Sequence, residues 1–159
     1  MKNYAETTLF REPFIFEDFC RGLENLHFEV AIFDMSPGMS TLERSILSAM
    51  DEVVTPLTPE YFSLDGIDSF SKELSQINKS YRKKIQHKKI VVNAINQSFR
   101  RHKAILDQLD TLDYDIYHVS QDSKIAEAQL YNQSIFEYFP NSKTVTEIAR
   151  LADSLLEVN

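Results

Sequence analysis

The most informative pattern of apolar and polar positions lies between residues 28 and 67. An apolar run, 28–33, is interrupted by one glutamate and closed by Asp34. A turn and a helix-forming stretch, 41–50, lead to a second apolar run, 53–57. Short apolar runs bounded by turn signals are typical of strands buried on both faces. Two such strands joined by one helix predict a βαβ unit and therefore a parallel sheet.

The remaining pattern predicts an α/β fold, with a mostly parallel sheet of about four strands flanked by helices. The expected strands are 28–33, 53–57, 90–95 and 115–119, and the expected helices are 14–26, 41–50, 59–84, 100–109, 121–130 and 144–156. We see no boundary or repeat, so residues 1–159 are expected to form a single domain. Aromatic residues near the start, 10–19, are interpreted as core rather than as a binding site.

Composition limits the classes of function. The 159 residues carry a formal net charge of −7, so global attraction to nucleic acid is not expected, although a local basic patch can act. The single cysteine, Cys20, rules out an internal disulfide and fits a reducing cytoplasm. No apolar stretch reaches the roughly 20 residues that span a bilayer, and the first residues do not resemble a signal peptide. We therefore expect a cytoplasmic protein without membrane contact.

Two basic clusters are candidates for contact with nucleic acid. The first runs from Lys79 to Lys89 at the end of a predicted helix, where cations also complement the helix dipole. The second, Arg100, Arg101 and Lys103, opens the next helix, where cations oppose the dipole. This conflict favours an anion as the partner of Arg100, Arg101 and Lys103, with the first cluster helping.

The 28–67 stretch resembles the second half of the ParA/MinD family of P-loop ATPases, and most closely its ParA partition branch. The apolar strand that ends in Asp34 and a proline turn resembles the Walker B strand. Residues 59–66 match the family's Pro-Glu-x-Phe-x-Leu-x-Gly as Pro-Glu-Tyr-Phe-Ser-Leu-Asp-Gly. Further along, residues 124–128 keep Lys-x-x-Glu-Ala, although the family's preceding Pro and Arg are replaced. The resemblance covers about residues 25–157 and implies a partial P-loop NTPase-like fold.

The resemblance also implies roles for individual residues. Asp34 would hold Mg²⁺ beside ATP, and Asn93 would lie near the base of the nucleotide. Pro37, Pro59 and Glu60 would shape the turns on the nucleotide side. Each role has a structural alternative. Asp34 can cap a turn, Asn93 can be a hydrogen-bonded buried amide, and Pro59 with Glu60 can simply begin a helix.

The family's phosphate-binding loop is missing from these 159 residues. Gly-x-x-x-x-Gly-Lys-Ser/Thr supplies the backbone N–H groups and the lysine that hold the phosphates. The three glycines, Gly22, Gly38 and Gly66, are followed by leucine, methionine and isoleucine instead. The chain thus resembles a C-terminal half without its Walker A half, and fragment, truncated gene product and degenerate protein all stay open. An ATPase by resemblance, it is predicted to be inactive alone, and no catalytic residue is assigned.

The leading functional interpretation is a ParA-like partition or positioning ATPase that lacks its phosphate-binding half. In the family, a nucleotide-dependent dimer binds DNA nonspecifically and a ParB-like protein stimulates it. The alternative is a non-catalytic interaction module that keeps the fold. A MinD-like membrane role is less favoured, because the chain ends without a basic amphipathic face. Strand 28–33 is expected either to pair directly with 53–57 or to leave an edge for self-association or for the missing N-terminal half.

Overall fold

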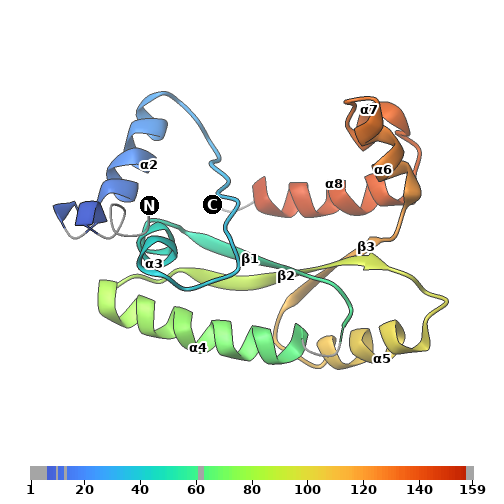
Figure 1. The fold of residues 1–159 in the computed structure, drawn as a ribbon, viewed down its shortest axis with the longest axis horizontal. Coiled ribbons are helices and arrows are strands. Elements are labelled where there is room, and N and C mark those ends of the chain that lie inside the picture. Colours follow the sequence, from blue (N-terminus) through green and yellow to red (C-terminus); the bar gives the residue numbers. More distant parts are fainter. Residues whose placement is uncertain (1–6, 10, 13, 61–62, 157–159) are drawn as a thin grey trace. The chain divides into compact units, whose positions relative to one another are not determined.

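The computed structural model of the protein describes residues 7–156 except 10, 13, 61 and 62. Helices and strands alternate along the chain from α3 to β3, and three helices follow (Figure 1). The helices are α2 (Ile15–Asn25), α3 (Thr41–Ser48), α4 (Ser63–Tyr81), α5 (Arg100–Leu109), α6 (Ser123–Leu130), α7 (Ile135–Tyr138) and α8 (Lys143–Leu156). The strands are β1 (Glu52–Leu57), β2 (Gln86–Ile95) and β3 (Asp115–Ser120).

The described strands form one sheet in the order β1-β2-β3, and β2 pairs with β3 in parallel. This confirms the predicted α/β class with a mostly parallel sheet, but with three strands rather than four. The predicted strand 28–33 is wrong for the described chain, because this segment is irregular and no strand lies beside it. An apolar sequence becomes a strand only when a neighbouring backbone completes the ladder. The expected direct pairing of 28–33 with 53–57 is therefore not found, and β2 is the neighbour of β1.

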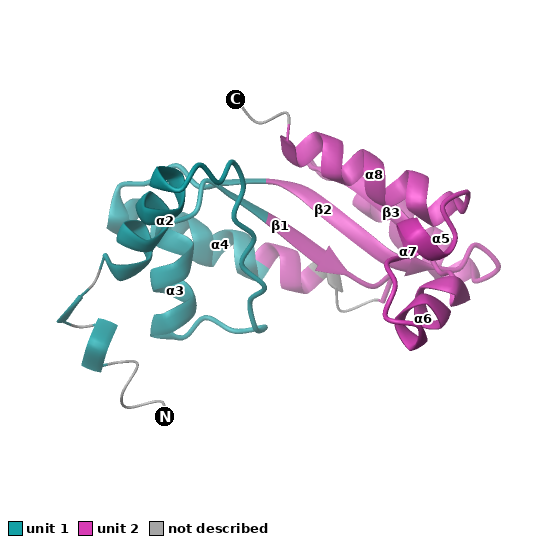
Figure 2. Ribbon diagram, turned by 90° about the horizontal axis from the view of Figure 1, so that it is seen from above, with its two compact units in different colours: residues 1–53, 69–87 teal, residues 54–68, 88–159 magenta. Residues whose placement is uncertain are grey.

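The chain divides into two compact units, residues 1–53 with 69–87 and residues 54–68 with 88–159 (Figure 2). The single domain expected from the sequence stays a prediction. The first unit has a small core made by Leu47 of α3, Leu74 and Ile77 of α4, and Ile85. Asn78 ties the end of α4 to the start of β2, since its side chain exchanges two hydrogen bonds with the backbone of Ile85.

The second unit is built around β2. Ile90 and Val92 are completely buried and pack with Ile105 and Leu109 of α5. Alternation along the strand sends the intervening Val91 to the opposite face. Figure 1 shows α5 and α8 on opposite faces of the β2–β3 pair, and α8 packs against β3. This double cover explains why the consecutive residues Ile90, Val91 and Val92 of β2 are all apolar.

A β-bulge interrupts the ladder near the end of β2. The register runs from Ile90 opposite Ile116 to Val92 opposite His118, and then shifts before Ile95 meets Ser120. Ala94 takes a φ of 56°, a left-handed conformation that residues with a side chain rarely adopt. The Asn93 side chain accepts a 2.8 Å hydrogen bond from the Ala94 N–H, which holds the bulge.

The loop before α3 is fixed by one buried carboxylate. Glu43 is 9% exposed and accepts hydrogen bonds from the Ser36 hydroxyl at 2.8 Å, from the Ser40 N–H at 2.9 Å and from the Ser40 hydroxyl. With Ser40 as the N-cap, this is a capping box extended by Ser36. The Ser40 and Ser36 hydroxyls lower the pKa of Glu43 to about 2.

The bulge gives a first prediction. Replacing Ala94 by glycine removes the cost of a side chain at positive φ and should raise the free energy of unfolding by about 0.5–1 kcal/mol. The matched control is Ala104→Gly, at an exposed position inside α5. That change should lower the same free energy by about 1 kcal/mol. Urea unfolding of both variants checks the pair, and two equal losses would contradict strain at Ala94.

Glu43 gives a second prediction. Because its pKa is lowered by folding, its contribution to stability is present above about pH 4.5 and should disappear as the pH falls towards 2. Glu43→Gln should remove this component of the acid dependence, and Ser36→Ala should remove part of it by deleting one donor. Chemical unfolding of the three proteins between pH 2 and 6 tests this. An unchanged acid dependence in Glu43→Gln would contradict the assignment.

Candidate functional site

A shallow, open pocket of about 620 Å³ lies where β2 and β3 end. The carboxyl ends of neighbouring parallel strands are the usual place for ligands in open α/β sheets. The pocket is lined mainly by polar residues, Ile95, Asn96, Gln97, Ser120, Gln121, Asp122, Ser123, Ala126 and Lys143. All of them belong to the second unit.

The β2–α5 loop is held in place by its own polar groups. The Asn96 N–H donates to Nδ1 of His102 at 3.1 Å, and the Asn96 side chain donates to Oε1 of Gln121 at 3.1 Å. The Gln121 N–H in turn donates to the Ile95 carbonyl at 2.9 Å. These bonds join the ends of the two strands, so amide groups face the pocket in a defined arrangement.

The opposite side of the pocket carries an ion pair. Glu147 of α8 accepts from the Ser120 N–H at 2.7 Å and from the Ser120 hydroxyl at 2.9 Å. Lys143 lies 3.0 Å from both the Ser120 hydroxyl and the Glu147 carboxylate. Burial acts to raise the pKa of Glu147, but the hydrogen bonds from Ser120 and Lys143 outweigh it and leave the pKa lowered.

The polar groups of this arrangement are of a kind that binds ligands. Asn96, Gln121 and Ser120 offer paired donors and acceptors of the kind that recognise a planar polar group. None of these three residues was predicted from the sequence to belong to a site. The sequence feature that could have indicated them is the group of polar residues directly after β2 and β3.

Asn93, which was predicted to lie near a nucleotide base, is exposed and does not line the pocket. The alternative of a buried amide is also wrong, because Asn93 is exposed and lies in the bulge that follows Val92. Its role in the described structure is the hydrogen bond to Ala94.

Asp34 and Pro37 are both exposed and belong to the first unit, whereas the residues that line the pocket belong to the second. Among the described residues no group of three or more His, Cys, Asp or Glu side chains could hold a metal ion. Their assignment to Mg²⁺ and ATP therefore stays a prediction. What the structure adds is that Ser36, between them, is anchored to Glu43.

The three glycines do not supply a phosphate cradle. None has a positive φ, and a Cβ added at any of them would meet nothing within 4 Å. Glycines in a phosphate loop are needed for left-handed backbone or for close approach of the ligand. Gly22, Gly38 and Gly66 serve neither purpose here, so these residues do not fit the phosphates of ATP.

Pro59 and Glu60 follow β1 in the second unit, where Pro59 is buried and Glu60 is exposed. In the described residues the predicted helix 59–84 runs from Ser63 to Tyr81, and Pro59 and Glu60 are not helical. Glu60 lies 3.8 Å from the guanidinium of Arg101, which brings a predicted nucleotide-side residue beside a predicted nucleic-acid residue.

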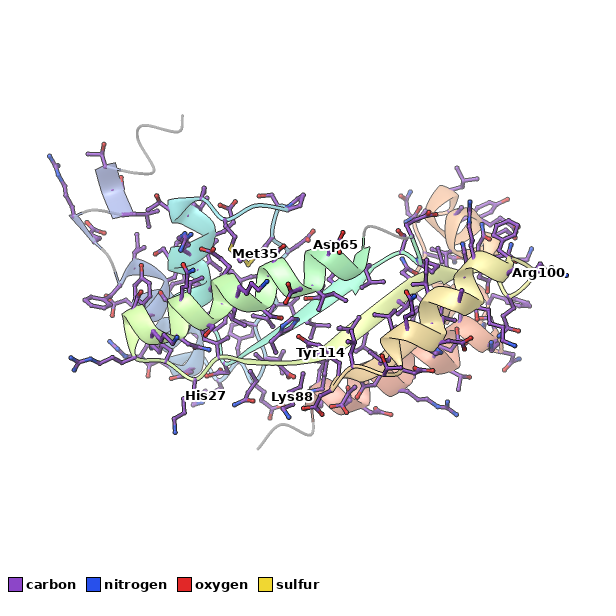
Figure 3. All side chains as sticks on the ribbon, turned by 90° about the horizontal axis from the view of Figure 1, so that it is seen from below. His27, Met35, Asp65, Lys88, Arg100 and Tyr114 are labelled. Carbon is purple, nitrogen blue, oxygen red and sulfur yellow. The ribbon has the colours of Figure 1, made fainter. Side chains whose placement is uncertain are left out.

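The first turn of α5 is cationic and exposed. Arg100, Arg101 and Lys103 are exposed, and this turn carries no acidic residue. Arg101 also lies over the ring of Phe99, 5.2 Å from its centroid, and Phe99 is 44% exposed. Figure 3 shows Arg100 reaching outward from the end of α5.

The proposed helpers in the other basic cluster are less suitable. Lys83 forms an ion pair with Glu17 at 3.2 Å, and Lys89 is only 8% exposed because β2 buries it. Lys84 and Lys88 remain exposed. The candidate nucleic-acid surface is therefore the first turn of α5.

Comparison with known proteins adds the following similarities. A family model described as "AAA domain" matches residues 6–87. The chain is 54% identical over 143 residues to the uncharacterized protein BBD21 of Borreliella burgdorferi, and 24% identical over 132 residues to the cell division protein PomZ of Myxococcus xanthus. These matches cover 90% and 81% of this chain, but only 58% and 41% of the relatives, so the chain spans about half their length.

One solved structure, a plasmid partition protein from Borrelia burgdorferi, is similar with a TM-score of 0.43 at 20% identity. That match covers 58% of this chain and 37% of the other. The family model covers more than half of the present chain, and its identity agrees with the resemblance carried by residues 28–66. The chain belongs to the AAA domain family, in its ParA-like branch.

Proposed function

We propose that the chain serves a partition or positioning role of the ParA-like type and that it contacts DNA nonspecifically through the first turn of α5. The observation that carries this proposal is the cluster of three exposed cations, Arg100, Arg101 and Lys103, at a helix N-terminus. The PomZ relative is named a cell division protein, which supports a role connected with cell division.

Charge and chemistry support a phosphate backbone as the partner of this turn. Cations at a helix N-terminus oppose the dipole, and an anion that binds there relieves the conflict. The Arg101 guanidinium has an ion-pair partner in Glu60, but both side chains are more than half exposed, so the pair is weak. Because a phosphate can replace Glu60 at little cost, this ion pair leaves Arg101 able to bind DNA.

Membership of the family implies the use of ATP and Mg²⁺ in the family. Binding of either by this chain is a separate question. If nucleotide is bound, the pocket between Asn96, Gln121 and Ser120 is suited to its base, whereas no described group replaces the phosphate loop. We therefore assign DNA contact to this chain, and hydrolysis to a complete phosphate-binding half. A ParB-like stimulator and a cytoplasmic location stay predictions; in the described chain no helix is long and apolar enough to cross a membrane.

The nucleotide part gives a third prediction. The chain alone should show no ATP hydrolysis and no micromolar binding of Mg-ATP, because the N–H cradle and its lysine supply most of the phosphate recognition. Calorimetric titration measures this directly. A dissociation constant in the micromolar range would contradict it.

The DNA part gives a fourth prediction. Duplex DNA of arbitrary sequence should bind the chain with an affinity that falls steeply as salt rises. The double variant Arg100→Glu and Arg101→Glu should weaken binding about tenfold or more at low salt, without changing the thermal unfolding midpoint much.

The control for this experiment reverses two exposed arginines elsewhere, Arg21→Glu with Arg150→Glu. It changes the net charge by the same amount but should keep most of the affinity. Fluorescence anisotropy with labelled DNA compares the three proteins. Equal losses in both variants would mean that net charge, rather than the α5 turn, governs binding, and no binding at low salt would remove the proposal.

A further inference from the structure

The polar pocket at the ends of β2 and β3 presents its amide groups with a fixed polarity. The Ser98 N–H donates to Oδ1 of the Asn96 side chain at 3.0 Å. A backbone N–H can only donate, so this bond decides which way the Asn96 amide points. The Nδ2 group of Asn96 therefore faces Gln121 and donates to its Oε1 at 3.1 Å.

The same chain of bonds orients the amide of Gln121. Because Oε1 of Gln121 accepts from Asn96, its Nε2 group remains as a donor, and this donor has no partner in the part of the chain that the structure describes. Gln121 is exposed and lines the pocket, as does the ammonium group of Lys143, which can also only donate. A ligand in this pocket must therefore offer acceptors to these groups.

An acceptor follows the Gln121 donor directly in the sequence. Asp122 lines the pocket, and its Oδ1 caps α6 by accepting from the Lys124 N–H at 2.9 Å. Its other carboxylate oxygen has no hydrogen-bond partner among the described residues. An ionised carboxylate only accepts, so Asp122 favours a ligand group that carries N–H. The pocket thus combines a donor and an acceptor on neighbouring residues.

We propose that this pocket takes guanine, a keto purine, rather than the adenine that membership of the family implies. Guanine offers acceptors at O6 and N7 and carries N–H groups at N1 and N2. In the proposed pairing Gln121 donates to O6, and Asp122 accepts from N1 and N2. Adenine has an amino group in place of O6, which would set a donor against the Gln121 donor. We rest this assignment on the proposed use of the pocket for a nucleotide base, and the DNA contact of α5 is independent of it.

The size of the preference follows from the mismatch at Gln121. A matched pair of hydrogen bonds to a base discriminates against the wrong base by a factor of about five to a hundred. The pocket is shallow and open, so water can satisfy part of a mismatch. We therefore expect guanine to be preferred over adenine about tenfold.

NMR titration of the intact chain with the mononucleotides GMP, IMP and AMP tests the pairing. The three carry the same phosphate and differ only in the base, so the phosphate cancels in any ratio of affinities. Without a phosphate loop GMP should bind with a dissociation constant of roughly 1 mM, about tenfold tighter than AMP. The side-chain amide signals of Asn96 and Gln121 should shift as GMP binds. IMP, which lacks the amino group at N2, should bind more weakly than GMP.

Two carboxylate substitutions in the pocket separate hydrogen-bond polarity from charge. Gln121→Glu keeps an acceptor for Asn96 but replaces the donor that faces the ligand by an acceptor, so AMP should now bind more tightly than GMP. The control is Gln97→Glu, which adds the same charge at an exposed position that also lines the pocket. It should weaken both nucleotides alike and leave their ratio near that of the unchanged chain.

A third variant, Asp122→Ser, tests the acceptor. Serine is also a good N-cap, so α6 should keep its first turn while the unpartnered carboxylate oxygen is lost. GMP and IMP should then bind equally. The backbone amide spectrum of each variant shows whether the fold is kept.

Several results would overturn the assignment. Equal binding of GMP and AMP, or tighter binding of AMP, by the unchanged chain would exclude a preference for guanine. Equal binding of GMP and IMP would exclude the pairing with Asp122, and an inverted ratio in Gln97→Glu would mean that charge governs the choice. If no mononucleotide shifts the pocket signals at about 10 mM, the pocket is not a base site. DNA binding by the α5 turn, measured by anisotropy, succeeds or fails separately from each of these.

Discussion

The second unit depends on one backbone ladder, the parallel pairing of β2 with β3. It brings the last residues of both strands to the same edge of the sheet, which places Asn96 beside Gln121 and Ser120 beside Glu147. It also determines where α5 starts, because only four residues separate the end of β2 from Arg100. The pocket and the cationic turn are therefore two products of the same ladder.

The elements that sequence predicts well are those whose pattern is local. The helix 100–109 begins and ends where the sequence places it, and the strands at 53–57, 90–95 and 115–119 are all present with slightly longer bounds. For each of these elements, the spacing of the apolar residues and the flanking turn residues are enough to predict its type and position. The strand at 28–33 fails because a strand also requires a neighbour, and no pattern within the segment reveals whether one is there.

Among the site residues, too, those whose position follows from local pattern could be predicted, and those whose position depends on the rest of the fold could not. Exposure of Arg100, Arg101 and Lys103 follows from their position before the buried face of α5, so the sequence could predict it. The outward position of Asn93 could not be predicted, because it results from a bulge that adds one residue to β2. The aromatic residues of α2 were interpreted as core, yet Phe14 and Phe19 are more than half exposed, and Phe10 lies outside the described residues. A helix needs an opposing surface before its apolar face is buried, and the sequence does not state whether that surface exists.

The proline inside β1 has a consequence for how sheets of this protein can grow. Pro56 is exposed on the outermost described strand and has no N–H group to donate. A further strand laid against that edge would lose a ladder bond near the end of β1, so Pro56 disfavours edge-to-edge pairing of sheets on this side. One edge of the described sheet therefore resists the addition of strands, because of a single residue that cannot donate.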